Sequence, residues 1–372
     1  MKVLFQNKRK EVNVESNVEK IAELITGHCT RIKKKDNVCL VTSHTDAQLL
    51  YEIVRKKIIQ KGAIVYDHFV YGDYLDTYFT SRSFLKDASI EQLNYLPQFK
   101  LKEIKAMDVF IWIEATPNHC RFPVSGKRFS QWAKTLDPIG TEILKKRNIM
   151  TFFPTKDYAK LAKISLRELR KLYYDACLVD RKILSKEMNK IKKVFDGVKS
   201  VRIKGSHTDL TFSLNQRFGS MENGKENLPG GEVYYAPQEN SLEGIITFSF
   251  PGIYFGKEIK NIRLKFNHGK IVSAKASKNQ DILESIINTD HGSRFIGEFG
   301  IGCNFAVEKW VNEVFLSEVM LGTIHLAIGD SYKECKGTNK SAVHFDIVKD
   351  LRKEGEILIN DKLVMKKGTW IF

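Results

Sequence analysis

Acidic and histidine residues recur in short strand-like segments of the last 141 positions, and they are of the types that bind divalent metals. Glu232 lies in Gly-Gly-Glu-Val-Tyr-Tyr, Glu298 in Phe-Ile-Gly-Glu-Phe-Gly, and His325 in Gly-Thr-Ile-His-Leu-Ala-Ile-Gly. His344 and Asp346 share the segment Ala-Val-His-Phe-Asp-Ile-Val. Two glutamates, one aspartate and two imidazoles form the ligand set that two divalent metal ions need. Metal-dependent hydrolysis is therefore the first hypothesis.

The spacing of His344 and Asp346 predicts that both side chains point to the same side of one strand. Side chains two residues apart in a strand share a face. Val343, Phe345 and Ile347 then form the apolar face. The His-x-Asp pair occupies the other face, where it can reach one metal or two adjacent metals.

The segment around His325 has the same alternation. Ile324, Leu326 and Ile328 form its buried face, and His325 points the other way beside the small Ala327, which would leave room for an ion. Each histidine taken alone fits a half-buried polar residue that the backbone satisfies. The recurrence of the same pattern, with glycine nearby, favours a joint site.

Strands and helices alternate in the first half of the chain. Strands are expected at 37–42, 63–66 and 108–113, and residues 43–46 (Ser-His-Thr-Asp) are expected to cap a helix. Such alternation predicts an open, mostly parallel sheet with crossover helices. The turn after the first strand has no glycine-rich phosphate fingerprint, so the sheet alone does not indicate a dinucleotide cofactor.

The pattern changes after a helical stretch at about 156–195, which Asp196-Gly197 ends. Beyond it the chain is β-rich, and it closes with a hairpin of 357–359 and 363–365 joined across Asn360-Asp361. We therefore expect an N-terminal α/β domain at 1–196 and a C-terminal α+β metal-binding domain at 197–372.

Composition limits the class of protein. At 372 residues and 42% hydrophobic, the chain can bury a substantial core, and its length favours two domains. No stretch of 18 apolar residues is present, so no membrane span is expected, and the basic N-terminus is not followed by the apolar core of a signal peptide. The six cysteines are dispersed without a Cys-x-x-Cys, which indicates reduced thiols and a cytoplasmic location.

The net charge of +16 raises the possibility of nucleic-acid binding. The basic clusters at 31–35, 55–57, 145–147 and 190–193 are spread along the chain, at positions where lysines are usually solvated surface. No known nucleic-acid-binding motif accompanies them, so nucleic acid is not the expected partner. The charge would instead favour acidic peptides by long-range steering.

Four segments resemble the motifs of the thermophilic metallo-aminopeptidase family, the group of aminopeptidase T, aminopeptidase S and PepS. They are 227–237 (Asn-Leu-Pro-Gly-Gly-Glu-Val-Tyr-Tyr-Ala-Pro), 296–304, 322–332 and 343–348. Their order and the closing hairpin with Gly-Thr-Trp also match. The resemblance is specific over about the last 150 residues, and before residue 197 it concerns the general layout only.

The resemblance implies roles for individual residues. The five residues above would be the ligands of two metals, zinc or cobalt, and Tyr332 would stabilise the reacting carbonyl oxygen. Glu318 stands near the place of the family's glutamate close to the metals, although its spacing to His325 differs. Glu298 or Glu318 would relay the proton of the attacking water. The resemblance also implies peptide substrates with a free N-terminus and a homodimer.

Three other interpretations start from the same residues. A mononuclear iron(II) ring-cleaving dioxygenase resembles this family and would need only His325, His344 and Asp346, which leaves Glu232 and Glu298 without a use. A non-catalytic relative would keep the ligands for stability or dimerisation. A cysteine protease that uses Cys303 and a histidine is disfavoured, because Cys303 lies between Gly302 and Asn304 without a helix start to lower its pKa.

Overall fold

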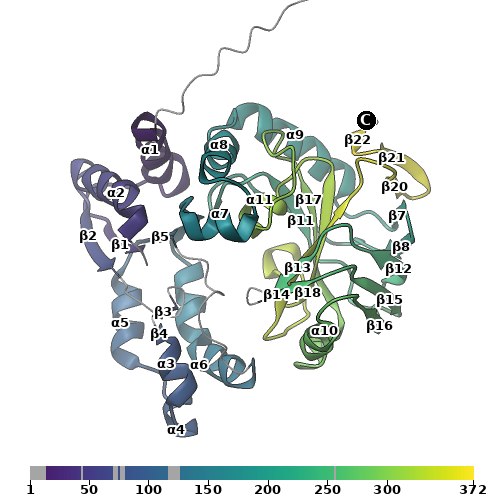
Figure 1. Ribbon diagram of the computed structural model, residues 1–372, viewed down its shortest axis with the longest axis horizontal. Coiled ribbons are helices and arrows are strands. Elements are labelled where there is room, and N and C mark those ends of the chain that lie inside the picture. Colours follow the sequence, from purple (N-terminus) through teal and green to yellow (C-terminus); the bar gives the residue numbers. More distant parts are fainter. Residues whose placement is uncertain (1–13, 43–44, 70–73, 76–79, 116–125, 255–256) are drawn as a thin grey trace, which may run out of the picture.

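The chain folds into a parallel-sheet half and an antiparallel-sheet half, which stand side by side in the computed structural model (Figure 1). The structure describes residues 14–42, 45–69, 74–75, 80–115, 126–254 and 257–372. A parallel sheet with crossover helices followed by a β-rich part confirms the fold class expected from the sequence.

The first half is built on a five-stranded parallel sheet of order β10-β6-β5-β1-β2. Its strands are β1 (Asn37–Thr42), β2 (Ile64–Phe69), β5 (Val109–Glu114), β6 (Arg147–Phe152) and β10 (Asn227–Leu228). The three strands expected from the sequence are present. Strand β5 is buried along its whole length, as is typical of a sheet that helices cover on both faces.

Helices cover both faces of this sheet, and each face has its own apolar core. One core joins the sheet to α1, α2, α7 and α8, and the other joins it to α3–α6. The elements are α1 (Val14–Leu24), the π-helix η1 (Ile25–Cys29), the 3₁₀-helix η2 (Thr45–Ala47), α2 (Gln48–Gln60), β3 (Tyr74–Leu75), β4 (Thr80–Ser81), α3 (Arg82–Asp87), α4 (Ile90–Leu93), α5 (Gln98–Ala106), α6 (Gly126–Leu144), α7 (Lys156–Ala162) and α8 (Leu166–Cys177). The expected helix cap at 43–46 lies partly outside the described residues.

The helical stretch expected at about 156–195 is present with these bounds, but it consists of three helices: α7, α8 and α9 (Arg181–Phe195). Lys163 ends α7 in the left-handed conformation (φ 57°). Ser165 then caps α8 with a capping box, and Asp180 caps α9 by accepting from two backbone N–H groups. Side-chain caps therefore divide a segment whose apolar periodicity runs on across the breaks.

Two antiparallel sheets form the second half, and a large apolar core lies between them together with α9. The five-stranded sheet has the order β19-β18-β17-β11-β9, and the eight-stranded sheet has the order β16-β15-β12-β8-β7-β20-β21-β22. The strands of the first are β9 (Ser220–Glu222), β11 (Glu232–Tyr235), β17 (Ile296–Gly302), β18 (Thr323–Gly329) and β19 (His344–Asp350). Those of the second are β7 (Val201–Gly205), β8 (Thr208–Phe212), β12 (Glu243–Thr247), β15 (Arg263–Asn267), β16 (Lys270–Lys275), β20 (Glu356–Ile359), β21 (Lys362–Lys366) and β22 (Thr369–Trp370).

The remaining elements are the pair β13 (Gly252–Tyr254) and β14 (Lys257–Ile259), helices α10 (Gln280–Ile287) and α11 (Val314–Ser317), and the 3₁₀-helices η4 (Gly292–Arg294) and η5 (Lys333–Cys335). The closing hairpin of β20 and β21 forms as expected, and its turn residues Asn360 and Asp361 have positive φ values of 47° and 66°.

Segments from each half of the chain pack into the other half. Strand β10 extends the first sheet, and apolar residues between 307 and 320 join the core around α1 and α8. Helix α9 packs into the core of the second half. The boundary at 196/197 therefore stays a prediction.

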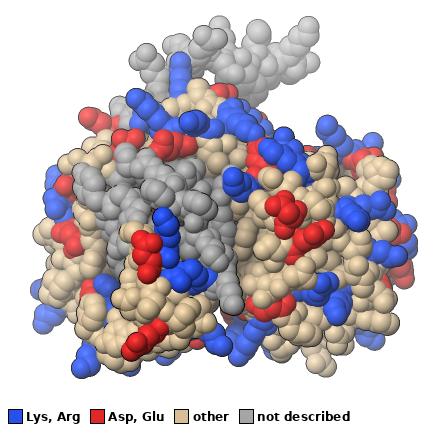
Figure 2. Space-filling view, turned by 60° about the horizontal axis from the view of Figure 1, so that its bottom comes forward, with Lys and Arg blue, Asp and Glu red and all other residues tan. Residues whose placement is uncertain are grey.

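Charged side chains are interspersed on the face shown in Figure 2, where Lys and Arg alternate with Asp and Glu over both halves. Many of the basic residues are paired on the surface, for example Lys171 with Asp175 and Lys190 with Glu187. In the part of the chain that the structure describes, no helix is long and apolar enough to cross a membrane.

Candidate metal centre

Backbone pairing in the five-stranded sheet brings the five predicted ligands to one of its faces. Ala327 on β18 lies in register between Glu298 on β17 and Asp346 on β19. His325 lies two residues further along β18 and so shares that face, and Glu232 reaches it from β11 across β17. The opposite face of the sheet belongs to the apolar core.

A glycine provides the space for the imidazole of His325. Gly300 is the residue paired with His325, and a Cβ at position 300 would lie 2.0 Å from Nε2 and Cε1 of the ring. Any other residue at 300 would push the ring out of the site. The space beside His325 therefore comes from the neighbouring strand and not, as expected, from the small Ala327 on its own strand.

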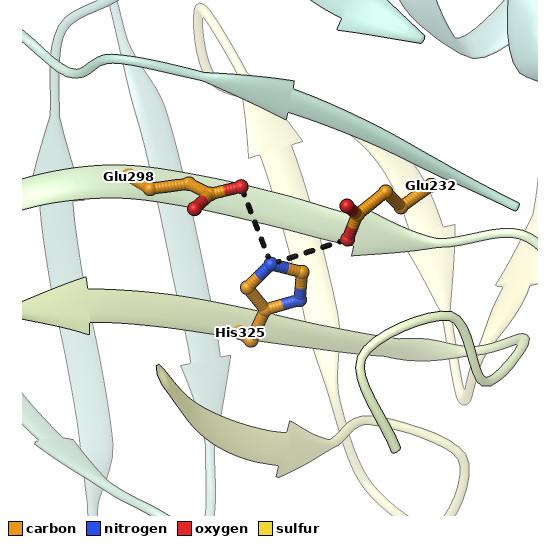
Figure 3. Close-up of side chains that lie close together, drawn as sticks. All are labelled: Glu232, Glu298 and His325. Atoms are coloured by element: carbon orange, nitrogen blue, oxygen red, sulfur yellow. Dashed lines mark ion pairs between the residues drawn. The ribbon is translucent and has the colours of Figure 1, made fainter. Parts of the chain in front are cut away.

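The first of two ligand groups consists of Glu232, Glu298 and His325, all nearly buried (Figure 3). Nε2 of His325 lies 3.4 Å from Oε2 of Glu232 and 3.5 Å from Oε1 of Glu298. Figure 3 shows both carboxylates turned toward this nitrogen from neighbouring strands.

Glu298, His344 and Asp346 form the second group. Nε2 of His344 lies 3.2 Å from Oε2 of Glu298 and 3.4 Å from Oδ2 of Asp346. Nδ1 of His344 faces the backbone oxygen of Asp330 at 3.3 Å, which leaves Nε2 directed at the carboxylates. Glu298 thus offers one oxygen to each group, the arrangement of a carboxylate that bridges two ions.

The charges of the five groups strongly shift one another's pKa values. Desolvation lowers the imidazole pKa values, but hydrogen bonds and charges of the carboxylates outweigh it and raise the pKa of His325 to about 9 and that of His344 to about 10. Burial favours a neutral Glu298, yet the two imidazoles lower its pKa to about 2. Burial raises the pKa of Glu232 to about 8. Protonated imidazoles therefore balance the buried negative charge when no cation is present.

Several polar side-chain atoms at this centre are buried without a hydrogen-bond partner among the described residues. They are Oε2 of Glu232, Nδ1 of His325, Oδ1 of Asp346 and Oε1 of Glu318. Leaving such an atom unsatisfied costs about 1–3 kcal/mol, and more for a charged group. Oxygen and imidazole donors of this kind suit zinc, cobalt, manganese or iron(II). The residues thus fit a pair of divalent metal ions that share one carboxylate.

Glu318 lies beside this centre, at the end of α11. Its carboxyl group lies near that of Asp346, and it lines the same pocket as His344. Burial and the charge of Asp346 raise the pKa of Glu318 well above its usual value, which favours its neutral form. Glu318 therefore lies beside the ligands, although its spacing to His325 differs from that of the longer family members.

Tyr332 also reaches the centre, from the loop between β18 and β19. Its ring packs against Tyr234 with centroids 4.9 Å apart and against the imidazole of His344 at 5.5 Å. Desolvation and the charge of Glu298 raise the pKa of Tyr332, so its phenol is a neutral hydrogen-bond donor. The ring is 36% exposed, which leaves it accessible to a ligand.

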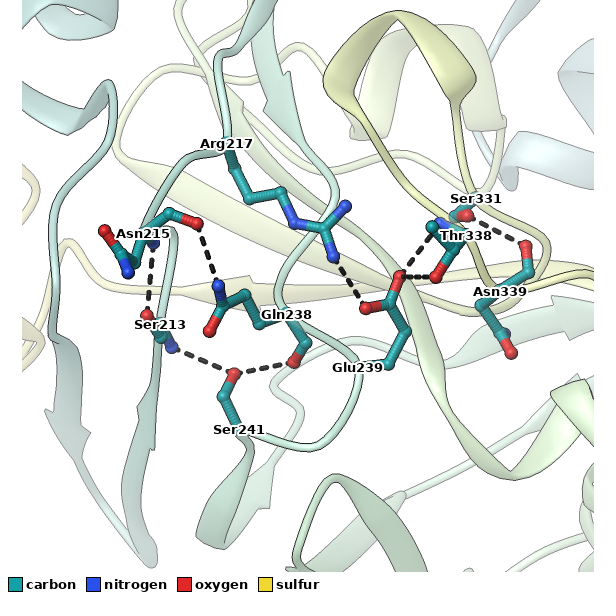
Figure 4. A network of polar contacts seen from close by, with 9 residues as sticks. All are labelled: Ser213, Asn215, Arg217, Gln238, Glu239, Ser241, Ser331, Thr338 and Asn339. Carbon is teal, nitrogen blue, oxygen red and sulfur yellow. Dashed lines mark hydrogen bonds and ion pairs between the residues drawn. The ribbon is translucent and has the colours of Figure 1, made fainter.

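A polar network fastens the loop that carries Tyr332 to the rest of the second half (Figure 4). Oε1 of Glu239 accepts hydrogen bonds from the backbone N–H and the hydroxyl of Thr338, at 2.8 and 2.7 Å. Arg217 holds the other oxygen of Glu239 at 2.6 Å. The N–H of Gly337 in turn donates to the backbone oxygen of Tyr332 at 2.9 Å.

A pocket of about 180 Å³ opens beside His344 and Asp346. Asn312 and Glu313 line it, at 3% and 6% exposure. Burial and the neighbouring Glu114 raise the pKa of Glu313 to about 8. Neither residue was predicted from the sequence, because no strand periodicity or glycine marks them. Their one signal is the polar pair Asn-Glu within an apolar segment.

The thiol considered for a cysteine protease is 2% exposed at position 303, and burial raises the pKa of Cys303 further. Its sulfur donates to the backbone oxygen of Ile301 at 3.2 Å. These surroundings suit a structural thiol.

Comparison with known sequences identifies a family profile over nearly the whole chain and relatives over part of it. The profile of the family described as thermophilic metalloprotease (M29) matches residues 14–370. Aminopeptidase AmpS of Bacillus subtilis is 31% identical over 195 residues, which cover 44% of this chain and 47% of that protein. Aminopeptidase T of Thermus thermophilus is 26% identical over 202 residues, 46% of this chain and 49% of that protein. The matches thus span about half the length of these relatives.

Solved structures share the fold over nearly the full length. The structure of AmpT from Thermus thermophilus aligns with a TM-score of 0.78 at 20% identity and covers 96% of this chain and 100% of that one. The 2,5-dihydroxypyridine dioxygenase of Pseudomonas putida aligns with a TM-score of 0.62 at 14% identity, over 96% and 97%. At these identities the likeness concerns the fold alone.

Proposed function

Because the chain belongs to the M29 family of thermophilic metalloproteases, we propose that it is a metal-dependent aminopeptidase that releases N-terminal residues from peptides. The observation that supports this proposal most is the pair of ligand groups that share Glu298, each with buried atoms that lack a partner. The amide-cleaving chemistry of this family needs metals, and two such groups would hold two of them.

Glu232, Glu298 and His325 would hold one divalent ion, and Glu298, His344 and Asp346 the other. Zinc and cobalt suit this donor set equally. When bound, the metals lower the pKa of a coordinated water from 15.7 toward about 7 and polarise the peptide carbonyl.

The protein's own groups supply the other requirements of hydrolysis. Tyr332, a neutral phenol, would donate a hydrogen bond to the oxygen of the carbonyl under attack, where such donors contribute roughly 2.7–4 kcal/mol. Glu318, which lies beside Asp346 and whose pKa burial raises, would pass a proton to the leaving amine, and Glu298 is the other candidate for this step.

The substrate's free α-amine would bind at the carboxylate-rich centre, which explains cleavage next to the N-terminus. The homodimer and the cytoplasmic location expected from the sequence remain predictions.

Metal content and activity on blocked peptides test the function together. We expect two metal ions per chain in protein purified without chelator, with cleavage of free-amine peptides but not of their N-acetyl forms. One iron per chain and no peptide cleavage would instead favour the dioxygenase hypothesis. Absence of metal after reconstitution would contradict both.

A further inference from the structure

Tyr234 lies on the same face of the antiparallel sheet as the metal ligands, two residues after Glu232 on β11. Its side chain is 4% exposed, yet it belongs neither to the two ligand groups nor to the large apolar core on the opposite face of the sheet. It packs instead with Ala236 and Cys335 in a small apolar cluster. A buried tyrosine thus stands beside the ligands without being one of them.

This cluster joins β11 to the loop that carries Tyr332. Cys335, in η5, directs its sulfur at the backbone oxygen of Tyr234 at 3.5 Å. Gly337 lies so close to the strand that a Cβ at this position would stand 2.8 Å from the Cβ of Ala236. The loop therefore lies directly on β11, and Tyr234 is the large side chain at this contact.

Tyr234 contacts the loop in two ways. Its ring packs against that of Tyr332 with centroids 4.9 Å apart, while the imidazole of His344 contacts the same phenol at 5.5 Å. Its hydroxyl donates to Oε1 of Glu334 at 3.1 Å, two residues after Tyr332. The ring contact restricts rotation of the phenol, and the hydrogen bond restricts displacement of the loop.

On the basis of the proposed aminopeptidase activity, in which Tyr332 donates to the carbonyl oxygen, we propose that Tyr234 is a positioning residue for this phenol and that Glu334 fixes Tyr234. Tyr234 then touches neither substrate nor metal and acts through Tyr332. Because β11 also carries Glu232, one strand sets the place of a metal ligand and of the oxygen donor, and so the distance between them. A misplacement of about 1 Å can cost roughly a hundredfold in rate.

Two substitutions separate the ring of Tyr234 from its hydroxyl. With the metal-loaded protein and a free-amine peptide, Tyr234→Phe keeps the ring and should lower kcat by about three- to fivefold, and Glu334→Ala should do the same. Tyr234→Leu loses the ring and should lower kcat by about thirtyfold or more. KM should change by less than about twofold, and the metal content should not change, since no ligand is altered.

Removal of the phenol tests whether these losses pass through it. In a Tyr332→Phe background, Tyr234→Leu should cause no further fall in kcat. A full loss in that background would overturn the proposal, because Tyr234 would then act on the site by another route. An unchanged kcat in Tyr234→Leu alone would overturn it as well.

Tyr235→Phe is the matched control, because Tyr235 is the next residue of the same strand and points into the apolar core. Its hydroxyl donates to the backbone oxygen of Lys192 at 3.1 Å. Loss of this hydrogen bond should lower the melting temperature and leave kcat unchanged. A fall in kcat equal to that of Tyr234→Phe would mean that any buried hydroxyl of β11 affects the rate through the fold.

Fluorine NMR with a single fluorotyrosine at position 332 separates this proposal from the proposed function. We expect one narrow resonance with natural Tyr234 and also in Tyr235→Phe. Tyr234→Leu should give a second resonance, or broadening that changes with temperature, because the freed phenol exchanges between orientations. A single narrow resonance in Tyr234→Leu would overturn the proposal. A protein that cleaves no peptide yet shows the exchange would refute the aminopeptidase and keep Tyr234 as the residue that positions Tyr332.

Discussion

The two five-stranded sheets of this protein bury their residues in opposite ways. In the parallel sheet, apolar side chains fill both faces, and β5 reads Val-Phe-Ile-Trp-Ile with one core on each side. In the antiparallel sheet, one face joins the apolar core, while the other carries three carboxylates and two imidazoles, of which Glu232, Glu298 and His325 are buried. In the parallel sheet, burial of apolar side chains stabilises the fold. The antiparallel sheet keeps charges in a desolvated place, where each acts strongly on the others and on a bound cation.

The largest effect is expected from removing the carboxylate shared by the two ligand groups. Glu298→Ala should lower kcat/KM by more than about 10³-fold, because several kcal/mol of metal-derived stabilisation would be lost. Bound metal, measured by elemental analysis, should fall from two ions per chain to one or none. The fold should persist, since the opposite face of the sheet is unchanged, and circular dichroism checks this. Two retained metals with full activity would show that the site is wrongly assigned.

The corresponding change in the parallel sheet should act on stability and not on chemistry. Ile111→Ala on β5 removes a fully buried side chain and should lower the free energy of unfolding by about 2–5 kcal/mol. Urea unfolding measures this loss. Below the unfolding transition, metal content and kcat should match the natural protein. A change in kcat comparable to that of Glu298→Ala would contradict the view that the parallel sheet serves stability and the antiparallel sheet serves the reaction.

Strand periodicity explains why much of this division could be predicted from the sequence. His344 and Asp346 share a face because they are two residues apart, and the apolar Phe345 between them marks the core side. The position of Glu318 beside Asp346, in contrast, depends on how α11 packs against β19. Asn312 and Glu313 reach the pocket through the same packing. Contacts between elements leave no periodic signal in a single sequence.

The helices show the same limit. Apolar spacing across 156–195 predicted one stretch, although Ser165 with Glu168 forms a capping box and Asp180 caps the next helix. Periodicity reports which face is buried, whereas helix ends depend on a few hydrogen bonds at single positions.

The pH dependence of stability should distinguish metal-free from metal-loaded protein. The raised pKa values of His325 and His344, about 9 and about 10, mean that protonation of the imidazoles stabilises the metal-free fold fully below about pH 6.5. That contribution is lost as the pH rises through 9 to 10. Bound metal replaces these protons, so its affinity should increase with pH over the same range.

Melting temperatures between pH 7 and 10 measure how the stability of the metal-free and metal-loaded protein depends on pH. Between pH 7 and 10, the melting temperature of the protein in chelator should fall by roughly 2–5 °C more than that of the metal-loaded protein. In His344→Gln the chelated protein should show a smaller fall, because one of the two imidazoles is gone. Parallel curves with and without metal would contradict the assignment of both histidines.

The smallest effect is expected at the loop that carries Tyr332, where a positioning contact should alter rate without altering metal binding. Glu239 accepts two hydrogen bonds from Thr338 and is held by Arg217, whose side chain is only 10% exposed. Glu239→Gln weakens these charge-assisted contacts. We expect kcat to fall by about five- to tenfold with little change in KM, since the loop would hold the phenol less firmly.

A double-mutant cycle decides whether that loss passes through the phenol. If Glu239 acts by placing Tyr332, the combination of Glu239→Gln with Tyr332→Phe should be no slower than Tyr332→Phe alone. Asp209→Asn is the control, because it breaks the Arg202–Asp209 pair on the exposed surface of the other sheet and should leave kcat unchanged. Additive losses in the double variant would mean that Glu239 supports the fold in general. Non-additive losses would mean that Glu239 acts on the rate through Tyr332. The loop would then contribute the hydrogen-bond donor for the carbonyl oxygen, while the sheet contributes the metal ligands.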